Sequence, residues 1–425
     1  MAWTAQVTPR SLSLNTRIRL RAGVRGPCRL PASASSQRPG DVTLIDTTER
    51  LASVGHDPIQ DVTCFSCSVP LPRPLLVGHA TVTRRHYDLV RLRTASGLEG
   101  VAYAFGRGLP ITRIVEDALR PLLIGADSSL PELIRRHLSA SHWPYAERGL
   151  FSVAASAVDL ALWDMMGKRL GVPVADLLGK LRNEVPICAV GGYVRRTPED
   201  VSVLQEEMAG FIALGCKAVK ITIGSDDPSA DVQRLTAVRE VVGSRCTVVV
   251  DAFRSFTSLE DALRRLRLLE RFDLSYVEDP FSESLSSLVA DLRRRTGMLI
   301  GLGENLGGHR AFHDLIESGA VDVVRCDATV VGGVREFMAA TALASARGLE
   351  VSTHVHAPIH VHFGAALPHL HPAGLEYMDP AAGLDGLHEL LDTQLEIRAG
   401  YALVPDRPGF GIDWNWDAVK RYSNS

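Results

Sequence analysis

Thr247-Val-Val-Val-Asp251 is the first of three short apolar runs that each end in an acidic residue, the others being Leu274-Ser-Tyr-Val-Glu278 and Met298-Leu-Ile-Gly-Leu-Gly-Glu304. The acidic residues are 27 and then 26 positions apart, about the length of one strand–loop–helix–loop unit. A β-branched run predicts a buried parallel strand, whose C-terminal end lies on the site-bearing face of a β/α barrel. Three carboxylates meeting there would repel one another without a divalent cation between them. The pattern therefore predicts a metal site.

The chain repeats this unit from residue 185 to residue 377. Amphipathic segments such as Leu259–Leu269 and Val334–Ala346 separate most of the apolar runs. Eight strands joined by right-handed crossovers favour a (β/α)-barrel, a modified TIM barrel, over residues 184–385. No Gly-x-Gly-x-x-Gly opens a helix in the first unit, which argues against a dinucleotide-binding fold. The eight candidate strands are Val185–Val190, Ala218–Ile223, Thr247–Asp251, Leu274–Glu278, Met298–Gly301, Val321–Arg325, Glu350–His354 and Gly374–Tyr377.

Three further segments flank the predicted barrel. The pattern of residues 58–183 indicates strands followed by helices, and this order predicts an N-terminal α+β capping domain. Residues 386–425 are expected to return to this capping domain. Residues 1–57 are predicted to be a disordered extension, because the first 40 contain seven Arg and no acidic residue. An organellar transit peptide is the alternative for that segment.

Composition excludes several classes of protein. Hydrophobic residues make up 46% and charged residues 22% of the chain, and the formal net charge is −3. Neither a nucleic-acid partner nor a membrane partner is expected, since the chain is not basic and shows no apolar run of the roughly 18 residues that span a bilayer. Seven scattered cysteines, including Cys64-Phe-Ser-Cys67, favour incidental thiols in a reduced compartment. We therefore expect a cytoplasmic protein, with organellar targeting left open by the first 57 residues.

Polar or charged residues also stand at the ends of the other candidate strands. Lys220 and Thr222 end the second strand, Asp327 follows the sixth, His354 ends the seventh and Glu376 lies in the eighth. The carboxyl ends of parallel barrel strands meet at one face. These groups are therefore expected to converge with the three acidic residues of the apolar runs.

Several motifs together resemble the enolase superfamily, in its mandelate racemase/muconate lactonizing enzyme branch, over about residues 58–420. The motifs are Ala155-Ser-Ala-Val-Asp-Leu-Ala-Leu-Trp-Asp164 through Pro173-Val-Ala-Asp-Leu-Leu-Gly179, Lys217-Ala-Val-Lys-Ile-Thr-Ile-Gly224, Val277-Glu-Asp-Pro280, Gly303-Glu304, Asp327-Ala-Thr-Val-Val-Gly-Gly333 and Ser352-Thr-His354.

The resemblance implies a metal site with Mg²⁺ held by Asp251, Glu278 and Glu304, where it would bind the carboxylate of a small-molecule substrate. It also implies that Asp327 orients His354 and raises its basicity as the catalytic base. A homo-oligomer, from dimer to octamer, is a further implication.

Two more catalytic residues follow from the resemblance. Lys220 would neutralise substrate charge, and Glu376 would donate a hydrogen bond to the developing enediolate, which requires a raised pKa. Relatives with two bases carry a second lysine where this chain has Thr222. Thr222 cannot abstract a proton at neutral pH, so a one-base reaction is predicted.

One base suffices to dehydrate a hydroxylated acid, such as an acid sugar, to a 2-keto acid. The chain is accordingly predicted to be a lyase of the acid-sugar dehydratase type. A sugar-lactone cycloisomerase and a one-base epimerase remain alternatives. A binding protein that kept the metal site and lost turnover is the alternative from another class.

Candidate substrate contacts are Thr222, Arg254, His356 and Arg107, and the loops near Pro72–His79 and Phe105–Pro110 are expected to close over the barrel mouth. Phe253 stands where relatives commonly have Asn. Six histidines lie between positions 354 and 371, and all but His354 are expected to be mostly polar groups of loops or helix surfaces.

Overall fold

A computed structural model of the protein describes residues 56–423 except residues 79 and 195–199. Nearly all of the predicted extension 1–57 therefore lies outside the described residues. Within them, eight parallel strands form a barrel in the order β11–β4–β5–β6–β7–β8–β9–β10. A bridge between Val351 and Leu370 joins β10 to the chain that leads into β11. The predicted barrel fold is confirmed.

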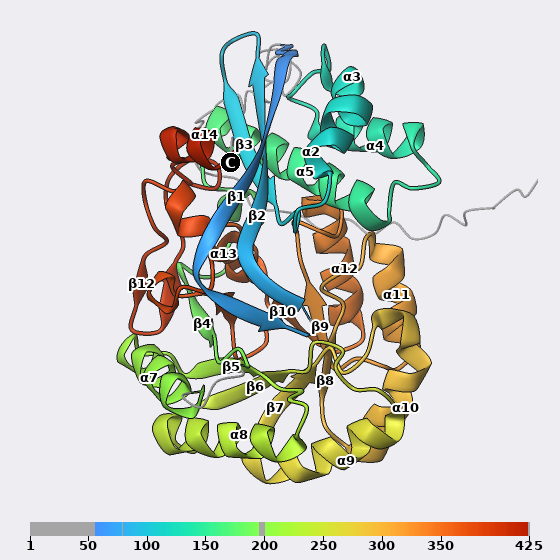
Figure 1. Cartoon of the computed structure of the whole chain (residues 1–425). Coiled ribbons are helices and arrows are strands. Elements are labelled where there is room, and N and C mark those ends of the chain that lie inside the picture. The colour runs from blue at the N-terminus through green and yellow to red at the C-terminus, as the bar shows by residue number, and fades with distance from the viewer. Residues whose placement is uncertain (1–55, 79, 195–199, 424–425) are drawn as a thin grey trace, which may run out of the picture. The chain divides into compact units, whose positions relative to one another are not determined.

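Each barrel strand overlaps one of the candidate strands. The observed bounds are β4 Glu184–Val190, β5 Ala218–Thr222, β6 Thr247–Asp251, β7 Leu274–Glu278, β8 Ile300–Leu302, β9 Val323–Cys326, β10 Glu350–Thr353 and β11 Leu375–Tyr377. Helices follow the first seven strands, and those from α7 to α12 surround the barrel in Figure 1. Their bounds are α7 Asp200–Ala213, α8 Pro228–Val242, α9 Leu259–Leu269, α10 Ser286–Thr296, α11 His309–Glu317, α12 Val334–Ala346 and α13 Ala357–Ala366.

Strand alternation builds the barrel interior in layers. Val219 and Ile221 of β5 join the core between strands and helices, whereas Ala218 belongs to a small apolar cluster inside the barrel. That inner cluster consists of Cys188, Ala218, Val249, Tyr276, Val323 and Ala373. Two residues further along, the same faces of β5, β6 and β9 carry Lys220, Asp251 and Arg325. Inside the barrel, a layer of charged side chains therefore follows the apolar cluster in the direction of the carboxyl ends of the strands.

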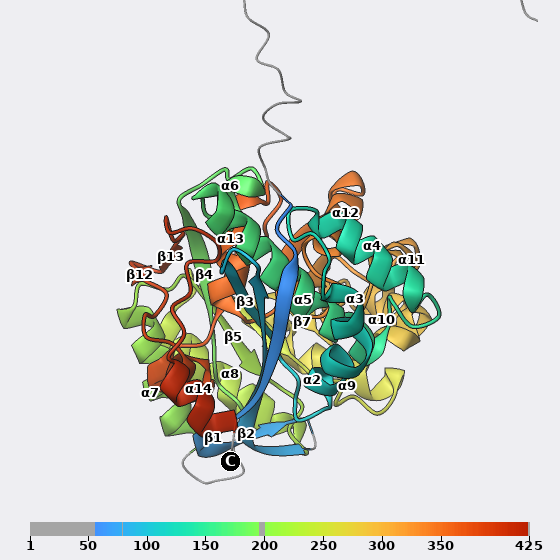
Figure 2. The ribbon, with the colours of Figure 1, turned by 90° about the horizontal axis from the view of Figure 1, so that it is seen from above.

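An antiparallel sheet of β1 (Ile59–Val77), β2 (Ala80–Thr94) and β3 (Glu99–Ala104) precedes the barrel, and Figures 1 and 2 show its long β1–β2 hairpin. Of the segment Pro72–His79, expected as a loop, residues 72–77 are strand, and His79 lies outside the described residues. β1 continues through its prolines with a register shift between Pro70 and Leu75. An edge strand tolerates proline because one side of it needs no ladder hydrogen bonds. β1 therefore stays paired with β2 up to Val77, and this hairpin is called the β1–β2 arm below.

Helices α2 (Ile111–Ile114), α3 (Arg120–Leu123), α4 (Pro131–Ser141), α5 (Gly149–Leu170) and α6 (Val174–Leu177) follow the sheet. By length and composition alone α5 could cross a membrane, although Asp159 and Asp164 interrupt its apolar sequence. Most of α5 is nevertheless buried inside the structure. Its Asp159 accepts from Val334 N–H at 2.7 Å, which ties the helix to the start of α12.

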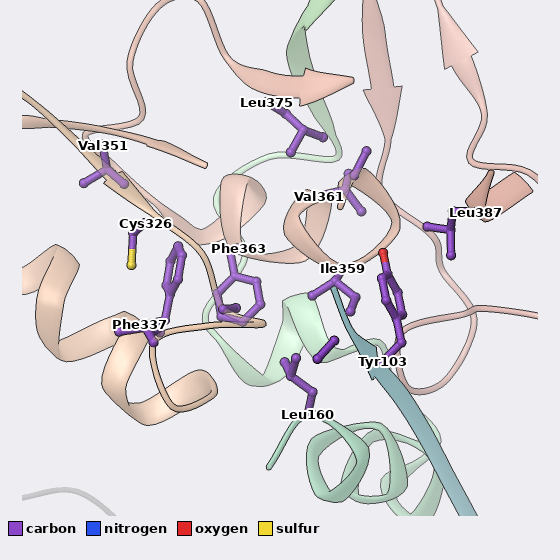
Figure 3. Close-up of a cluster of buried hydrophobic side chains, with 14 of the residues drawn as sticks. Tyr103, Leu160, Cys326, Phe337, Val351, Ile359, Val361, Phe363, Leu375 and Leu387 are labelled. Carbon is purple, nitrogen blue, oxygen red and sulfur yellow. The ribbon is translucent and has the colours of Figure 1, made fainter. Parts of the chain in front are cut away.

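The apolar core continues from the capping helices into the barrel helices. Figure 3 shows Leu160 of α5 near Ile359 and Phe363 of α13, with Phe337 of α12 beside them. The Phe337 and Phe363 rings are 4.4 Å apart. One continuous apolar cluster therefore connects the capping sheet and helices to the barrel.

The C-terminal segment touches both parts. β13 (Tyr401–Leu403) pairs antiparallel with β4 and with β12 (Ile397–Arg398). Trp416, at the start of α14 (Trp416–Ser423), lies 5.6 Å from the Phe65 ring of β1. The chain after the barrel thus contacts the sheet that precedes it.

Asp88 of β2 is 1% exposed, and burial raises its pKa from 3.8 to about 6, against a smaller lowering by Ser66 across the strand pair. Its charge is therefore unfavourable in the folded state above about pH 6, and the penalty disappears below about pH 4, where the carboxyl is protonated in both states. We expect Asp88→Asn to stabilise the fold by about 2 kcal/mol at pH 8 and not at pH 4. Thermal unfolding at both pH values measures this. A gain independent of pH would contradict it, and Asp117→Asn at an exposed site is the control.

Candidate active site

The predicted metal ligands meet at the carboxyl end of the barrel. Asp251 ends β6, Glu278 ends β7 and Glu304 follows β8, and all three are buried. Lys220 Nζ lies 3.2 Å from Asp251 Oδ2 and 2.8 Å from Glu278 Oε1. The convergence expected from strand spacing is therefore present in the structure.

Arg325 enters the same cluster from β9 and is fully buried. Its Nη2 lies 3.0 Å from Glu278 Oε1, 2.7 Å from Glu376 Oε1 and 3.8 Å from Glu304 Oε2. Sequence reasoning missed this residue. Arg325 could have been identified from its position in the sequence. Residues two apart on a strand point to the same side, and Asp327, two residues after Arg325, was already expected to point into the barrel.

The cluster fits a divalent cation. Four carboxylates (Asp251, Glu278, Glu304 and Glu376) face two cations, Lys220 and Arg325, which leaves a formal charge of about −2 in a buried site. Glu278 Oε2 is buried and has no hydrogen-bond partner among the described residues. A free carboxylate oxygen is the ligand that Mg²⁺ prefers. The three predicted ligands can therefore hold it.

Lys220 remains a cation. Burial alone would lower the pKa of its ammonium, but Glu278, Glu376 and Asp251 raise the pKa well above its ordinary value. A lysine held in this way cannot take a proton from a substrate at neutral pH. Its charge can instead offset that of a bound anion.

Asp327 and His354 form the expected pair, since His354 Nδ1 lies 2.7 Å from Asp327 Oδ2. Burial would raise the pKa of Asp327, but the facing imidazoles lower it well below its ordinary value. The carboxylate is thus ionised and fixes the imidazole through Nδ1. His354 Nε2, on the cavity side, lies 3.6 Å from Glu304 Oε2.

The turn after His354 is strained. Val355 and His356 adopt left-handed φ angles of 28° and 50°, which are unfavourable for a β-branched residue in particular. The strained turn lets Val355 N–H donate to Glu376 Oε2 at 2.9 Å. The backbone is therefore shaped to present His354 and to hold Glu376.

Glu376 differs from expectation, because a raised pKa was predicted for it. Burial would raise the pKa, but Arg325, Lys220 and His354 lower it to about 2. Lys220 Nζ donates to Glu376 Oε1 at 2.6 Å, so the carboxylate accepts hydrogen bonds and carries no proton to donate. In this structure the missed Arg325 reverses the predicted protonation state of Glu376.

Two of the four predicted substrate contacts are engaged elsewhere. Thr222 Oγ1 donates to Gly192 O at 3.1 Å and accepts from Val194 N–H at 2.9 Å, and its side chain lines a separate cavity. Arg254 lines the main cavity, but its guanidinium lies 3.2 Å from Asp279 and 2.9 Å from Glu283. Neither side chain is left free for an anion.

The other two predicted contacts, His356 and Arg107, both line the main cavity. His356 is buried, and burial lowers its pKa to about 3, so it is neutral. Its Nε2 lies 3.8 Å from Asp327 Oδ2, and Asp327, His354 and His356 offer a grouping that can also hold a metal ion. Arg107 is exposed and lies 5.4 Å over the Phe105 ring.

The histidines after His354 correct another expectation, because most are buried rather than at surfaces. His360 Nε2 accepts from Ala328 N–H at 2.9 Å and lies 3.4 Å from Asp327 Oδ1. His362 Nδ1 accepts from Ala175 N–H at 3.1 Å. The sequence did not reveal these roles, because apolar residues lie on every side of α13 and no face of it is marked as polar. The histidines of this helix are buried together with its apolar residues.

A cavity of about 530 Å³ connects these groups to the β1–β2 arm. The barrel contributes Lys220, Asp251, Glu304 and His354 to its lining, and the arm contributes residues 77–78 and 80–87. A volume of this size is typical of small-molecule sites. Pro72–His79 was expected at this mouth, and the arm meets that expectation as a hairpin instead of a loop.

Family models match most of the described chain. The mandelate racemase/muconate lactonizing enzyme N-terminal domain matches residues 59–179, and the enolase C-terminal domain-like family matches residues 203–418.

Individual relatives agree with these matches. The 3,6-anhydro-alpha-L-galactonate cycloisomerase of Streptomyces coelicolor is 32% identical over 362 residues, 83% of this chain and 96% of that protein. The L-talarate/galactarate dehydratase of Salmonella typhimurium is 31% identical over 371 residues, 85% and 90% of the two chains. The crystal structure of L-talarate dehydratase from Polaromonas sp. JS666, complexed with Mg and L-glucarate, is 29% identical with a TM-score of 0.77 and covers 86% of this chain and 97% of that one.

Proposed function

The chain belongs to the mandelate racemase/muconate lactonizing enzyme branch of the enolase superfamily and uses Mg²⁺, and from this premise we propose that it dehydrates a hydroxylated carboxylic acid, an acid sugar, to a 2-keto acid. The observation that carries the proposal is the 2.7 Å hydrogen bond between His354 and Asp327 beside a lysine that stays charged. The second base of two-base relatives is absent from the chain, because Thr222 stands at that position and its hydroxyl donates to Gly192 O.

Asp251, Glu278 and Glu304 would hold Mg²⁺, which would supply Lewis-acid stabilisation of the negative charge that develops on the substrate carboxylate. Lys220 adds a fixed positive charge beside it. The carboxylate of Asp327 holds His354 so that Nε2 is free toward the cavity.

His354 Nε2 takes the proton from the carbon next to the substrate carboxylate. The resulting imidazolium then donates that proton to the hydroxyl on the neighbouring carbon, whose C–O bond breaks, so that water leaves. A carbon–carbon double bond forms between the two carbons. The product is an enol, which becomes the 2-keto acid without the enzyme.

Cycloisomerisation of a sugar lactone is the second candidate, supported by the 29% identity over 350 residues to D-galactarolactone cycloisomerase of Agrobacterium fabrum. The same base then acts, and the leaving group is a ring oxygen. A one-base epimerase would return the proton to carbon instead. A binding protein without turnover has no need for an oriented carboxylate–imidazole pair.

The test is a screen of mono- and dicarboxylic acid sugars with Mg²⁺ and semicarbazide, which reports 2-keto acids by absorbance. Formation of a keto acid is expected for at least one acid. Proton NMR in D₂O on the same set tests the alternatives. Deuterium at the carbon beside the carboxylate without a keto product would replace dehydration by epimerisation or cycloisomerisation.

A further inference from the structure

Arg85 of β2 is a buried cation whose hydrogen-bonding capacity is only partly used. It is 8% exposed and lines the main cavity. Its Nε donates to Leu384 O at 3.2 Å, whereas its Nη2 is buried without a hydrogen-bond partner among the described residues. Among the described residues, the ion pairs at this cavity join Lys220 and Arg254 to carboxylates and do not include Arg85, which acts on Asp385 only through its charge. Burying a guanidinium with an unpaired N–H group is unfavourable unless a bound ligand accepts a hydrogen bond from that group.

The neighbouring arginines differ from Arg85. Arg84 donates to Ser68 Oγ and Ser68 O, at 2.7 Å each, and Arg254 pairs with two carboxylates. Arg85 and Arg107 instead approach one aromatic ring, each with its guanidinium carbon 5.4 Å from the centre of Phe105. Two arginine side chains next to the same aromatic ring place positive charge on this part of the cavity lining, which favours the binding of an anion there.

Asp385 also lines the cavity and is the carboxylate that Arg85 affects electrostatically. Its Oδ1 is already engaged, because it accepts from the Tyr87 hydroxyl and from Leu387 N–H. Asp385 therefore lines the cavity next to Arg85 but does not pair with the guanidinium of Arg85.

The lining of the same cavity also includes Lys220, Asp251 and Glu304 of the metal cluster. Resting on the function proposed above, we propose that Arg85 binds the second carboxylate of a dicarboxylic hydroxy acid whose first carboxylate lies at the metal site. The planar fork of arginine matches the two oxygens of a carboxylate. A monocarboxylic acid sugar would place a hydroxyl there and leave the fork incomplete.

The test compares matched acids on the Mg²⁺-loaded full chain by titration calorimetry. Galactarate is compared with galactonate and glucarate with gluconate, pairs that differ only in the distal carboxylate. We expect the dicarboxylate of at least one pair to bind about 10-fold more tightly or better than its partner. Arg85→Gln is expected to remove this preference through a loss of about 10- to 100-fold for the dicarboxylate, with the monocarboxylate changed less than about 3-fold.

Arg84→Gln removes a neighbouring positive charge from the same strand and is the matched control, with a change below about 3-fold expected for either acid. Arg85→Lys keeps the charge without the fork and should recover part of the preference, which a structural defect would not produce. If no dicarboxylate in the set binds better than its partner, or if the preference survives Arg85→Gln, the assignment is wrong. Tighter binding of 6-phosphogluconate than of glucarate would overturn it in favour of a phosphate.

These titrations are made in a His354→Asn background, which lacks the proposed base and therefore measures binding without turnover, so the two proposals fail separately. An Arg85-dependent preference without keto-acid formation keeps the subsite and overturns the dehydration. Keto-acid formation from monocarboxylates alone, with no Arg85-dependent preference, keeps the dehydration and overturns the Arg85 subsite.

Discussion

His354→Asn is expected to lower kcat/KM by about 10⁴-fold while leaving Mg²⁺ binding intact. Asparagine can still accept or donate a hydrogen bond at Asp327, but it has no imidazole nitrogen to take the proton. The metal ligands lie on other strands, and His354 approaches them no closer than 3.6 Å, at Glu304. Steady-state kinetics on the screened acid and calorimetric titration with Mg²⁺ measure the two effects.

His362→Asn provides a matched control from the same segment. His362 is also buried, but its nitrogens are engaged with Ala175 N–H and Phe410 O, outside the cavity. This substitution is expected to lower stability and leave kcat almost unchanged. Parent-like turnover by His354→Asn would contradict the assignment of the base.

Arg325→Met is expected to destabilise the protein by about 3–5 kcal/mol in the absence of Mg²⁺, because it removes a fully buried cation from the carboxylate cluster. Glu278 and Glu376 would then share Lys220 alone. Their protonation or rearrangement should also weaken Mg²⁺ binding. Urea unfolding with a chelator present measures the first effect, and Mg²⁺ titration measures the second.

Arg293→Met is the control for the loss of an arginine–carboxylate pair. Arg293 pairs with Asp322 at the surface, where its side chain is 37% exposed, and an exposed pair contributes about 0–1 kcal/mol. If the two substitutions shift the urea midpoint equally, Arg325 does not balance the cluster.

The barrel could be predicted from local pattern because its signals are short-ranged. Runs such as Thr247–Asp251 have the residue types of buried parallel strands, and their regular spacing leaves room for one helix each. The convergence of the metal carboxylates followed from the same regularity, since parallel strands end at one face. The pairing of His354 with Asp327 was expected from the resemblance to the enolase superfamily.

The partners of individual polar groups could not be predicted in this way. Glu376 was expected to carry a proton, but Arg325 and Lys220 keep it ionised in the structure. Thr222 has the inward register expected from alternation, yet its hydroxyl is used by the backbone of residues 192 and 194. Protonation state and availability depend on neighbours from strands that are distant in sequence.

The sequence alone determined the eight-strand barrel, its site-bearing end and the residue types gathered there, because each of these follows from periodicity along the chain. Only the tertiary structure decided which charges meet, that Arg254 is paired, and that Arg85 reaches the cavity from another sheet with part of its fork unused. Electrostatic energy depends on distances of a few ångströms in a buried site, and folding sets those distances between segments far apart in the sequence.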